Sequence, residues 1–321
     1  MTAPTVTVLH GGELPPNLGE IERLAQVRTA RADGLAEALR GSDVLLTWDF
    51  TTPALGSAWA GADRLRWVHT ASAGIDNVLT ADVRDSDVVV TNSRGVFETP
   101  IAEYVTGLVL MTAKDMLGTW QRQQRREWEH RETRRVQGRE AVVVGVGPIG
   151  RAVGRMLAAV GLRVRGVGRT RRSADPDFGE VAAGDDLGAV VAGADYLVLV
   201  APLTEQTRGM VDRDVLAAMP SSAMLVNVGR GELVVEDDLV RALQAGDIAA
   251  AALDVFEKEP LPPDSPLWTM PHVLVSPHMS ADTVGWRDDL AALFLENLGR
   301  WCRGEQLRNV VDKQLGYVPS T

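Results

Sequence analysis

Four side chains able to bind an anion or move a proton stand directly after apolar runs in the second half of the sequence. Arg230 lies in NVGRGEL, Asp254 and Glu259 in ALDVFEKEPLP, and His278 in SPHMSADT. If these runs are strands of one parallel sheet, the four residues meet at its carboxyl edge, where doubly wound folds bind ligands. An imidazole titrates near neutral pH, which makes His278 a candidate acid–base group. A single histidine after a strand is also often structural, and that alternative stays open at this point.

A glycine-rich loop precedes these segments in VVVGVGPIGRAVGRML. Gly145 permits a tight turn, Gly147 lets the backbone approach a pyrophosphate, and Gly150 lets the following helix pack closely on the strand. The N-terminus of that helix then faces the anion. The loop predicts a dinucleotide site, with a purely structural glycine turn or another nucleotide-like ligand as alternatives.

The next predicted strand ends in VRGVGRTRRS, with Gly168 where an NAD site would carry an acid for the ribose 2′-hydroxyl. A guanidinium binds a 2′-phosphate through two parallel hydrogen bonds, which a carboxylate would instead repel. We therefore expect a 2′-phosphate clamp made first by Arg169 and Thr170, with Arg171 or Arg172 behind them, and NADP as the cofactor. A solvated basic turn is the alternative.

Short apolar runs alternate with helical patterns along the chain, which predicts an α/β protein with parallel sheets. Strands are expected over 5–9, 43–48, 65–70 and 87–92, and then over 141–145, 162–168, 195–201, 223–229, 248–255 and 272–276. Between the two sets, Thr99 is expected to cap a connecting helix that starts at Pro100 and reaches about Trp128. The last helix carries an apolar stripe and is expected to fold back onto the first lobe. The predicted domains are 1–95 completed by 284–321 for substrate, and 96–283 for the dinucleotide.

Composition excludes several classes of protein. A net charge of −10 and a pI near 5.1 argue against general binding to nucleic acid or to anionic membranes. No signal peptide and no run of 18 apolar residues is visible, so the cytoplasm is the expected location. The single cysteine, Cys302, excludes an intrachain disulfide and a cysteine metal cluster, and no metal site is expected.

Several motifs in fixed order resemble the D-isomer-specific 2-hydroxyacid dehydrogenases. They are GVGPIG, APLTEQTRG, LVNVGRGELV, LDVFEKEPLP, SPLW and SPHMS, and the similarity extends back to HTASAGIDNV and TNSRGVFETPIAEY and forward to RNVVDKQLGY. The arginines after the predicted strand 162–168 and the SPLW segment are most similar to the glyoxylate/hydroxypyruvate reductase branch. The resemblance implies two Rossmann-like or flavodoxin-like domains with doubly wound parallel sheets and an active site in the cleft between them.

The resemblance also implies roles for the reactive side chains. Arg230 would bind the substrate carboxylate and polarise the C2 carbonyl. His278 would protonate the oxygen as hydride reaches C2, and Glu259 would hold the imidazole and favour its charged form. Asp254 would face the nicotinamide end of the cofactor.

Further contacts follow from the same resemblance. Backbone N–H groups around Ala73, Gly74 and Ile75 would hold the substrate carboxylate, although a turn alone could explain the glycine. Trp48 and Trp268 would line the substrate pocket, with core packing as the alternative. The remaining cofactor contacts would come from Pro148, Ile149, Pro202, Thr207 and Val228.

The expected function is reduction of a small 2-keto acid with NADPH, by a homodimer formed through the dinucleotide domain. A dinucleotide-sensing binding protein without turnover is the main alternative, and a formate or phosphite oxidiser is a third. Glyoxylate, hydroxypyruvate, pyruvate or a bulkier keto acid would all satisfy Arg230 and His278, so the sequence leaves the substrate side chain open.

Overall fold

A computed structural model describes residues 3–319, which form two compact units. The first unit contains the residues up to Phe97 and those from Thr283 onward, and the second runs from Glu98 to Asp282. The predicted boundaries lay at 95/96 and 283/284. Among the described residues no helix is both long and apolar enough to cross a bilayer.

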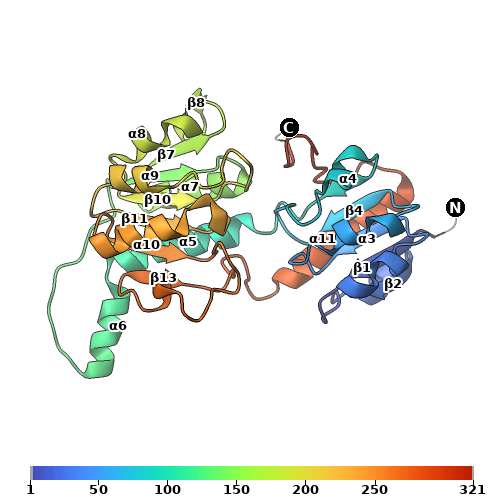
Figure 1. The fold of residues 1–321 in the computed structure, drawn as a ribbon, viewed down its shortest axis with the longest axis horizontal. Coiled ribbons are helices and arrows are strands. Elements are labelled where there is room, and N and C mark those ends of the chain that lie inside the picture. The colour runs from blue at the N-terminus through green and yellow to red at the C-terminus, as the bar shows by residue number, and fades with distance from the viewer. Residues whose placement is uncertain (1–2, 320–321) are drawn as a thin grey trace. The chain divides into compact units, whose positions relative to one another are not determined.

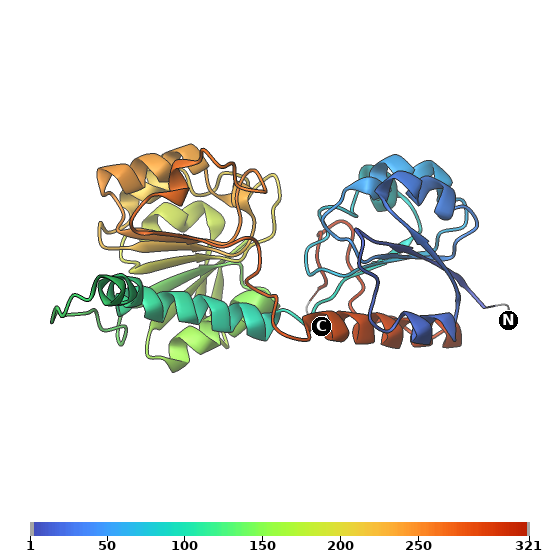
Figure 2. The same cartoon turned by 90° about the horizontal axis from the view of Figure 1, so that it is seen from below.

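The first unit is built on a five-stranded parallel sheet with the order β2-β1-β3-β4-β5 (Figure 1). Its strands are β1 (Thr5–Leu9), β2 (Gln26–Ala30), β3 (Val44–Thr47), β4 (Trp67–Thr70) and β5 (Val89–Thr91). Its helices are α1 (Leu18–Glu22), α2 (Leu35–Ala38), α3 (Ala54–Ala58), α4 (Ala81–Asp85) and α11 (Trp286–Arg303). Figure 2 shows α11 and α1 on one face of this sheet and α2 and α3 on the other. This order is the flavodoxin-like one, in which both faces of the sheet are covered.

The C-terminal helix belongs to the core of the first unit. Phe294 is fully buried, and its ring stacks on that of Trp67 with centroids 5.4 Å apart. The ring of Trp301 stacks on Trp67 as well, at 5.6 Å. The apolar stripe of the last helix therefore packs on β4 of the first unit.

The second unit is built on an eight-stranded sheet with the order β13-β12-β11-β10-β6-β7-β9-β8. All neighbouring strands are parallel except β8 and β9. The strands are β6 (Glu140–Val144), β7 (Arg163–Gly168), β8 (Arg172–Asp175), β9 (Gly179–Ala183), β10 (Tyr196–Leu199), β11 (Met224–Asn227), β12 (Ala250–Leu253) and β13 (Val273–Val275). The helices are α5 (Glu98–Ala113), α6 (Met116–Arg125), α7 (Pro148–Ala159), α8 (Leu187–Val191), α9 (Arg213–Ala218) and α10 (Glu236–Ala245). Strands β9, β7, β6, β10, β11 and β12 reproduce the 3-2-1-4-5-6 order of dinucleotide-binding sheets.

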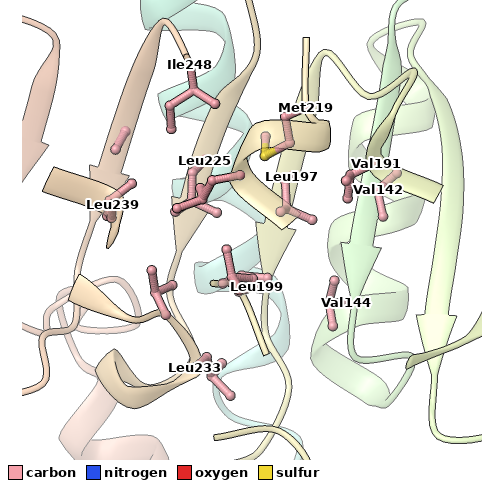
Figure 3. Packing of buried hydrophobic residues seen from close by; sticks show 14 of the residues in the cluster. Val142, Val144, Val191, Leu197, Leu199, Met219, Leu225, Leu233, Leu239 and Ile248 are labelled. Atoms are coloured by element: carbon pink, nitrogen blue, oxygen red, sulfur yellow. The ribbon is translucent and has the colours of Figure 1, made fainter. Parts of the chain in front are cut away.

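Helices cover both faces of this second sheet. Figure 2 shows α5 and α7 on one face and α10 on the other. A large apolar core fills the face beneath α8, α9 and α10, and Figure 3 shows part of it, from Val142 and Val144 on β6 to Leu225 on β11. Strands covered on both faces read as continuous apolar runs, which explains why β6, β10 and β11 were predictable.

Three strands were missed because they lack such runs. Strand β2 (QVRTA) is a partly exposed edge strand of the five-stranded sheet, and β8 (RSAD) is an edge strand of the eight-stranded sheet. Strand β9 (GEVAA) carries only one large apolar residue. The predicted strand 248–255 is also longer than β12, so that Asp254 lies in the loop that follows.

The predicted connecting helix was wrong at both ends. Helix α5 begins at Glu98, which places Thr99 inside its first turn and makes Pro100 its third residue. Proline is tolerated there because the first N–H groups of a helix have no partner within it. The helix does not continue to Trp128, because Asp115 adopts a left-handed conformation (φ 46°) and its carboxylate accepts from Gly118 N to start α6. Asp tolerates this conformation better than most residues.

Candidate active site

The loop that carries Arg230 is fixed by the residues on either side of it. Asn227, at the end of β11, accepts a hydrogen bond from Gly229 N (3.1 Å) and donates one to the carbonyl of Arg230 (2.9 Å). On the other side, a Cβ on Gly231 would lie 1.8 Å from the backbone carbon of Phe256. Only glycine allows this approach, so the Arg230 loop lies directly against the segment that follows β12.

That neighbouring segment carries Glu259. One carboxylate oxygen, Oε1, accepts from Phe256 N at 3.0 Å, and the other, Oε2, accepts from His278 Nδ1 at 2.8 Å. The backbone bond fixes the carboxylate, and the carboxylate in turn fixes the imidazole. The structure therefore brings Glu259 and His278 together, and holds Nδ1 so that Nε2 is the ring nitrogen available for proton transfer.

The loop after β13 holds His278 in an uncommon backbone conformation. Its φ is 52°, in the left-handed region that non-glycine residues seldom adopt. Its amide donates to Asp254 O (2.8 Å), and the Asp254 carboxylate, 1% exposed, accepts from Ser276 Oγ (2.7 Å), Met279 N (2.9 Å) and Ser280 N (2.8 Å). Asp254 thus organises the histidine loop. Its predicted contact with the nicotinamide stays a prediction.

Electrostatics at the site favour a charged imidazole beside a charged carboxylate. The hydrogen bond that His278 donates to Glu259 is the largest influence on the pKa of His278 and raises it, against burial and the nearby charge of Arg230. Burial by itself would raise the pKa of Glu259, but His278, Phe256 N and Arg230 together lower it. These shifts favour the protonated imidazole, which is the form of His278 that can donate a proton.

Two further residues at this site were not singled out from the sequence. Tyr104 of α5 interacts with the hydroxyl of Ser276, and its pKa is raised, mainly by burial and further by the charge of Asp254. The sequence placed Tyr104 in an apolar helical stripe, where its hydroxyl gave no separate signal. Ser276, the first residue after β13, could have been noticed as a polar side chain at a carboxyl edge.

The glycine loop fits a dinucleotide. Gly145 has φ +106°, and a Cβ there would meet the backbone of Ala201 at 2.8 Å; a Cβ on Gly150 would lie 1.7 Å from Gly145 O. A Cβ on Gly147, by contrast, would meet nothing within 4 Å, so this face of the loop is open where α7 begins. Helix N–H groups and an open glycine are what a pyrophosphate needs. Pro148 and Ile149 form the first turn of that helix.

Other predicted cofactor contacts lie at the ends of β10 and β11. Thr207 Oγ1 donates to Pro202 O at 2.7 Å, which closes the turn after β10. Val228 follows β11, and its amide donates to Leu199 O. All three lie at the same carboxyl edge as the glycine loop, because β6, β10 and β11 are parallel neighbours.

The basic segment after β7, residues 169–172, is exposed, but its side chains make different contacts. Arg171 contacts Asp186 (2.7 Å) and Glu180 (3.5 Å), whereas Arg172 is the first residue of β8 and contacts the buried Asp175 (3.3 Å). Arg169 and Thr170 lie in the turn between β7 and β8.

Arg151, in the first turns of α7, donates to both oxygens of Asp175 and also contacts Asp177. This ion pair lowers the pKa of Asp175 to about 2, and it fixes the β8 end of the basic segment. Sequence reasoning missed this arrangement because it depends on the hairpin of β8 and β9.

The predicted substrate residues of the first unit lie after β3 and β4. Asn92 Nδ2 donates to Ala73 O at 2.6 Å, and Ser72 Oγ donates to Gly74 O at 2.6 Å, so the 72–75 loop is well fixed. Ile75 and Trp48 are buried. Trp268, in the second unit, is half exposed, and its Nε1 donates to Pro262 O. Contact of these residues with substrate stays a prediction.

Comparison with known proteins agrees with this geometry. Residues 106–280 match the family profile described as D-isomer specific 2-hydroxyacid dehydrogenase, NAD binding domain. A glyoxylate/hydroxypyruvate reductase B of Yersinia pestis is 34% identical over 291 residues, covering 87% of this chain and 85% of that protein. A D-3-phosphoglycerate dehydrogenase of Methanocaldococcus jannaschii is 30% identical over 297 residues, but this chain spans only 56% of its length.

Among solved structures, an NADPH-dependent glyoxylate/hydroxypyruvate reductase of Sinorhizobium meliloti, in complex with NADP and sulfate, superposes with a TM-score of 0.83 at 28% identity. The match covers 98% of this chain and all of that one. Sequence profile, relatives and fold agree, and the chain therefore belongs to the D-isomer specific 2-hydroxyacid dehydrogenase family of oxidoreductases, with the nicotinamide-dinucleotide domain in its second unit.

Proposed function

We propose that this enzyme reduces a small 2-keto acid of the glyoxylate or hydroxypyruvate kind, with NADPH as the reductant. The observation that carries the proposal is the contact of His278 Nδ1 with Glu259 Oε2 at 2.8 Å, beside a loop that presents Arg230. The named reductases among the relatives support the same substrate class.

The chain's own residues supply binding and proton transfer. Arg230 binds the substrate carboxylate through charge-assisted hydrogen bonds and lowers the energy of the negative charge that develops on the C2 oxygen. His278 gives its Nε2 proton to that oxygen, and Glu259 stabilises the imidazolium beforehand. The bound nicotinamide supplies the hydride that completes the reduction.

A panel of 2-keto acids, assayed by NADPH oxidation, tests the proposed reaction. Replacement of His278 by Ala should remove most of the reduction, by a factor of about 100 or more, because the proton donor is lost. NADPH binding, measured by calorimetry, should persist in this variant. Unchanged kcat in His278→Ala would exclude His278 as the acid.

The proposed cofactor follows from two features near the end of β7. Gly168 supplies no carboxylate, and a Cβ there would lie 2.9 Å from Val146 Cγ2, so the position has little room for an acid. The exposed arginines that follow provide positive charge for a 2′-phosphate. Comparison of kcat/KM for NADPH and NADH tests the assignment, and a clear preference for NADH would overturn it.

We further propose that the enzyme is a homodimer through the α6 arm, which we define as residues 116–135. Met116, Leu117, Trp120 and Trp128 are all exposed on this arm, and Arg131 fixes the arm to Asp115 by a 2.6 Å ion pair. Several large exposed apolar side chains within one short segment are typical of a protein interface. Light scattering should report a dimer for the native chain and a monomer for the double variant Trp120→Glu, Trp128→Glu.

A further inference from the structure

Asp186 follows β9 and lies near the end of β7, where an NAD site would carry an acid and this chain has Gly168. Strand β9 pairs with β7 in parallel register, with Ala183 opposite Gly168. The turn that follows, Gly184–Asp186, begins so close to β7 that a Cβ on Gly184 would lie 4.0 Å from Gly168 O. Parallel strands end at the same edge of a sheet, so Asp186 reaches the edge at which the basic segment lies.

Arg171 is the basic residue that meets this carboxylate. Its Nη2 contacts Asp186 Oδ2 at 2.7 Å, and its Nη1 lies 3.5 Å from Glu180 Oε1. Arg172 is held differently, because it pairs with Asp175, which is buried and bound on both oxygens by Arg151. The contacts of Arg171 are with exposed or half-exposed side chains and can be exchanged, whereas Asp175 is fixed in its ion pair.

We propose that Asp186 lowers the enzyme's preference for NADPH over NADH, by holding Arg171 in an ion pair with which the cofactor 2′-phosphate must compete. The proposal rests on the proposed NADP site. A 2′-phosphate carries more negative charge than a carboxylate and displaces Asp186 from Arg171. The displaced carboxylate remains nearby and repels the phosphate, while a ligand without the 2′-phosphate leaves the ion pair intact.

The arrangement predicts a selective effect of removing the carboxylate. An exposed ion pair changes an equilibrium by about 1.5- to 5-fold, and like-charge repulsion adds to this. Asp186→Asn should therefore bind adenosine 2′,5′-bisphosphate about 3- to 10-fold more tightly at low ionic strength. Binding of 5′-AMP should change less than twofold. The gain should shrink at high salt, because charges this exposed are screened.

The test is isothermal calorimetry of the full-length chain with these two nucleotides, at low and high salt, together with kcat/KM for NADPH and NADH. Asp185→Asn is the matched control, because it removes the same charge one residue away, and it should leave the ratio of the two affinities unchanged. In an Arg171→Ala background, Asp186→Asn should tighten binding much less, because the competing ion pair is already absent and only the weaker like-charge repulsion is relieved. Melting temperatures verify that every variant is folded.

The results separate this inference from the proposed function. If the native chain prefers 5′-AMP and NADH, the NADP assignment itself fails. If it prefers the 2′-phosphate ligands, but Asp186→Asn leaves their affinity unchanged or weakens it, the competitive role of Asp186 is wrong. A gain of undiminished size in the Arg171→Ala background would also overturn the proposal, since the effect would not act through Arg171.

Discussion

A single hydrogen bond determines how His278 can work. Glu259 is fixed by Phe256 N through one oxygen and contacts the imidazole through the other. The imidazole therefore has a defined orientation and a defined proton to give. In the proposed reaction the protonated imidazole is the acid, so the pKa of His278 should set the alkaline limit of the reduction.

Replacement of Glu259 by Gln tests this relation. Gln keeps the size of the side chain but removes the charge and the strong acceptor, which are the main influences that raise the pKa of His278. Reduction should then decline at a lower pH than in the native enzyme, and kcat should fall at neutral pH. The measurement is a pH profile of kcat/KM for keto-acid reduction. Glu257→Gln, a nearby replacement with the same loss of charge, should leave the profile in place, and an unmoved profile in Glu259→Gln would contradict the assignment.

His69 shows the opposite electrostatic situation in the first unit. It is fully buried, contacts Thr91 Oγ1 through Nδ1 (2.7 Å), and burial lowers its pKa to about 3. The unfolded chain binds a proton at this residue below about pH 6.5, whereas the folded chain does not until about pH 3. This histidine therefore stabilises the fold less and less as the pH falls through that window.

The expected result is a free energy of unfolding that decreases from pH 6.5 to pH 5, by at most about 1.4 kcal/mol per pH unit from this group. Urea unfolding followed by tryptophan fluorescence measures it. His69→Gln should flatten the dependence, and replacement of the exposed His130 by Gln should not. Carboxylates with lowered pKa values, such as Asp175, titrate below this window.

At the level of elements, the active site depends on how closely two loops approach. Gly231 begins a short 3-10 turn and lies against the backbone of Phe256 and Glu257. This contact joins the loop of Arg230 to the loop of Glu259, although the two residues lie on different strand ends. A displacement of one loop would separate Arg230 from Glu259 and His278.

Gly231→Ala should therefore reduce both stability and catalysis. The added methyl group would overlap the backbone at 256, which must move, at a cost of about 1–3 kcal/mol. We expect kcat/KM for the keto acid to fall more than tenfold, while NADPH binding changes little. Gly188→Ala in α8 is the control, because its Cβ would meet nothing within 4 Å, and it should be neutral or slightly stabilising. Full activity in Gly231→Ala would show that the two loops are positioned independently.

The positions of the strands in their sheets explain which parts of the fold could be predicted. Strands β6, β10 and β11 are apolar throughout because both faces are covered, and their pattern is unambiguous. Edge strands such as β2 and β8 face water and carry polar residues, so no pattern marks them. The candidate residues Arg230, Glu259 and His278 were recognisable from their positions after strands and from family motifs. Asp186 was not, because its position next to Arg171 depends on the missed strand β9.

At the level of the whole molecule, the second unit is an insertion into the first. Its chain leaves the first unit after Phe97 and returns at Thr283, and the rings of Phe97 and Trp286 lie 6.5 Å apart. The ends of the insertion are therefore close together in the first unit. The first unit is completed by α11, whose Phe294 stacks on Trp67, and by the following segment, in which Val311 N donates to Val90 O.

Because the first unit is made from both ends of the chain and the second from one continuous segment, fragments of the chain should differ in whether they fold. A fragment from Glu98 to Asp282 contains a complete core and should fold by itself, with adenosine 2′,5′-bisphosphate binding retained. A fragment that ends at Phe97 should remain largely unfolded, because the face of β4 that α11 covers would be exposed to water. Circular dichroism and amide exchange distinguish the two outcomes. Joining residues 1–97 to 283–321 by a short Gly/Ser linker should restore folding, because the two ends to be joined lie close together in the first unit. If the joined chain fails to fold, the first unit needs the second for its stability.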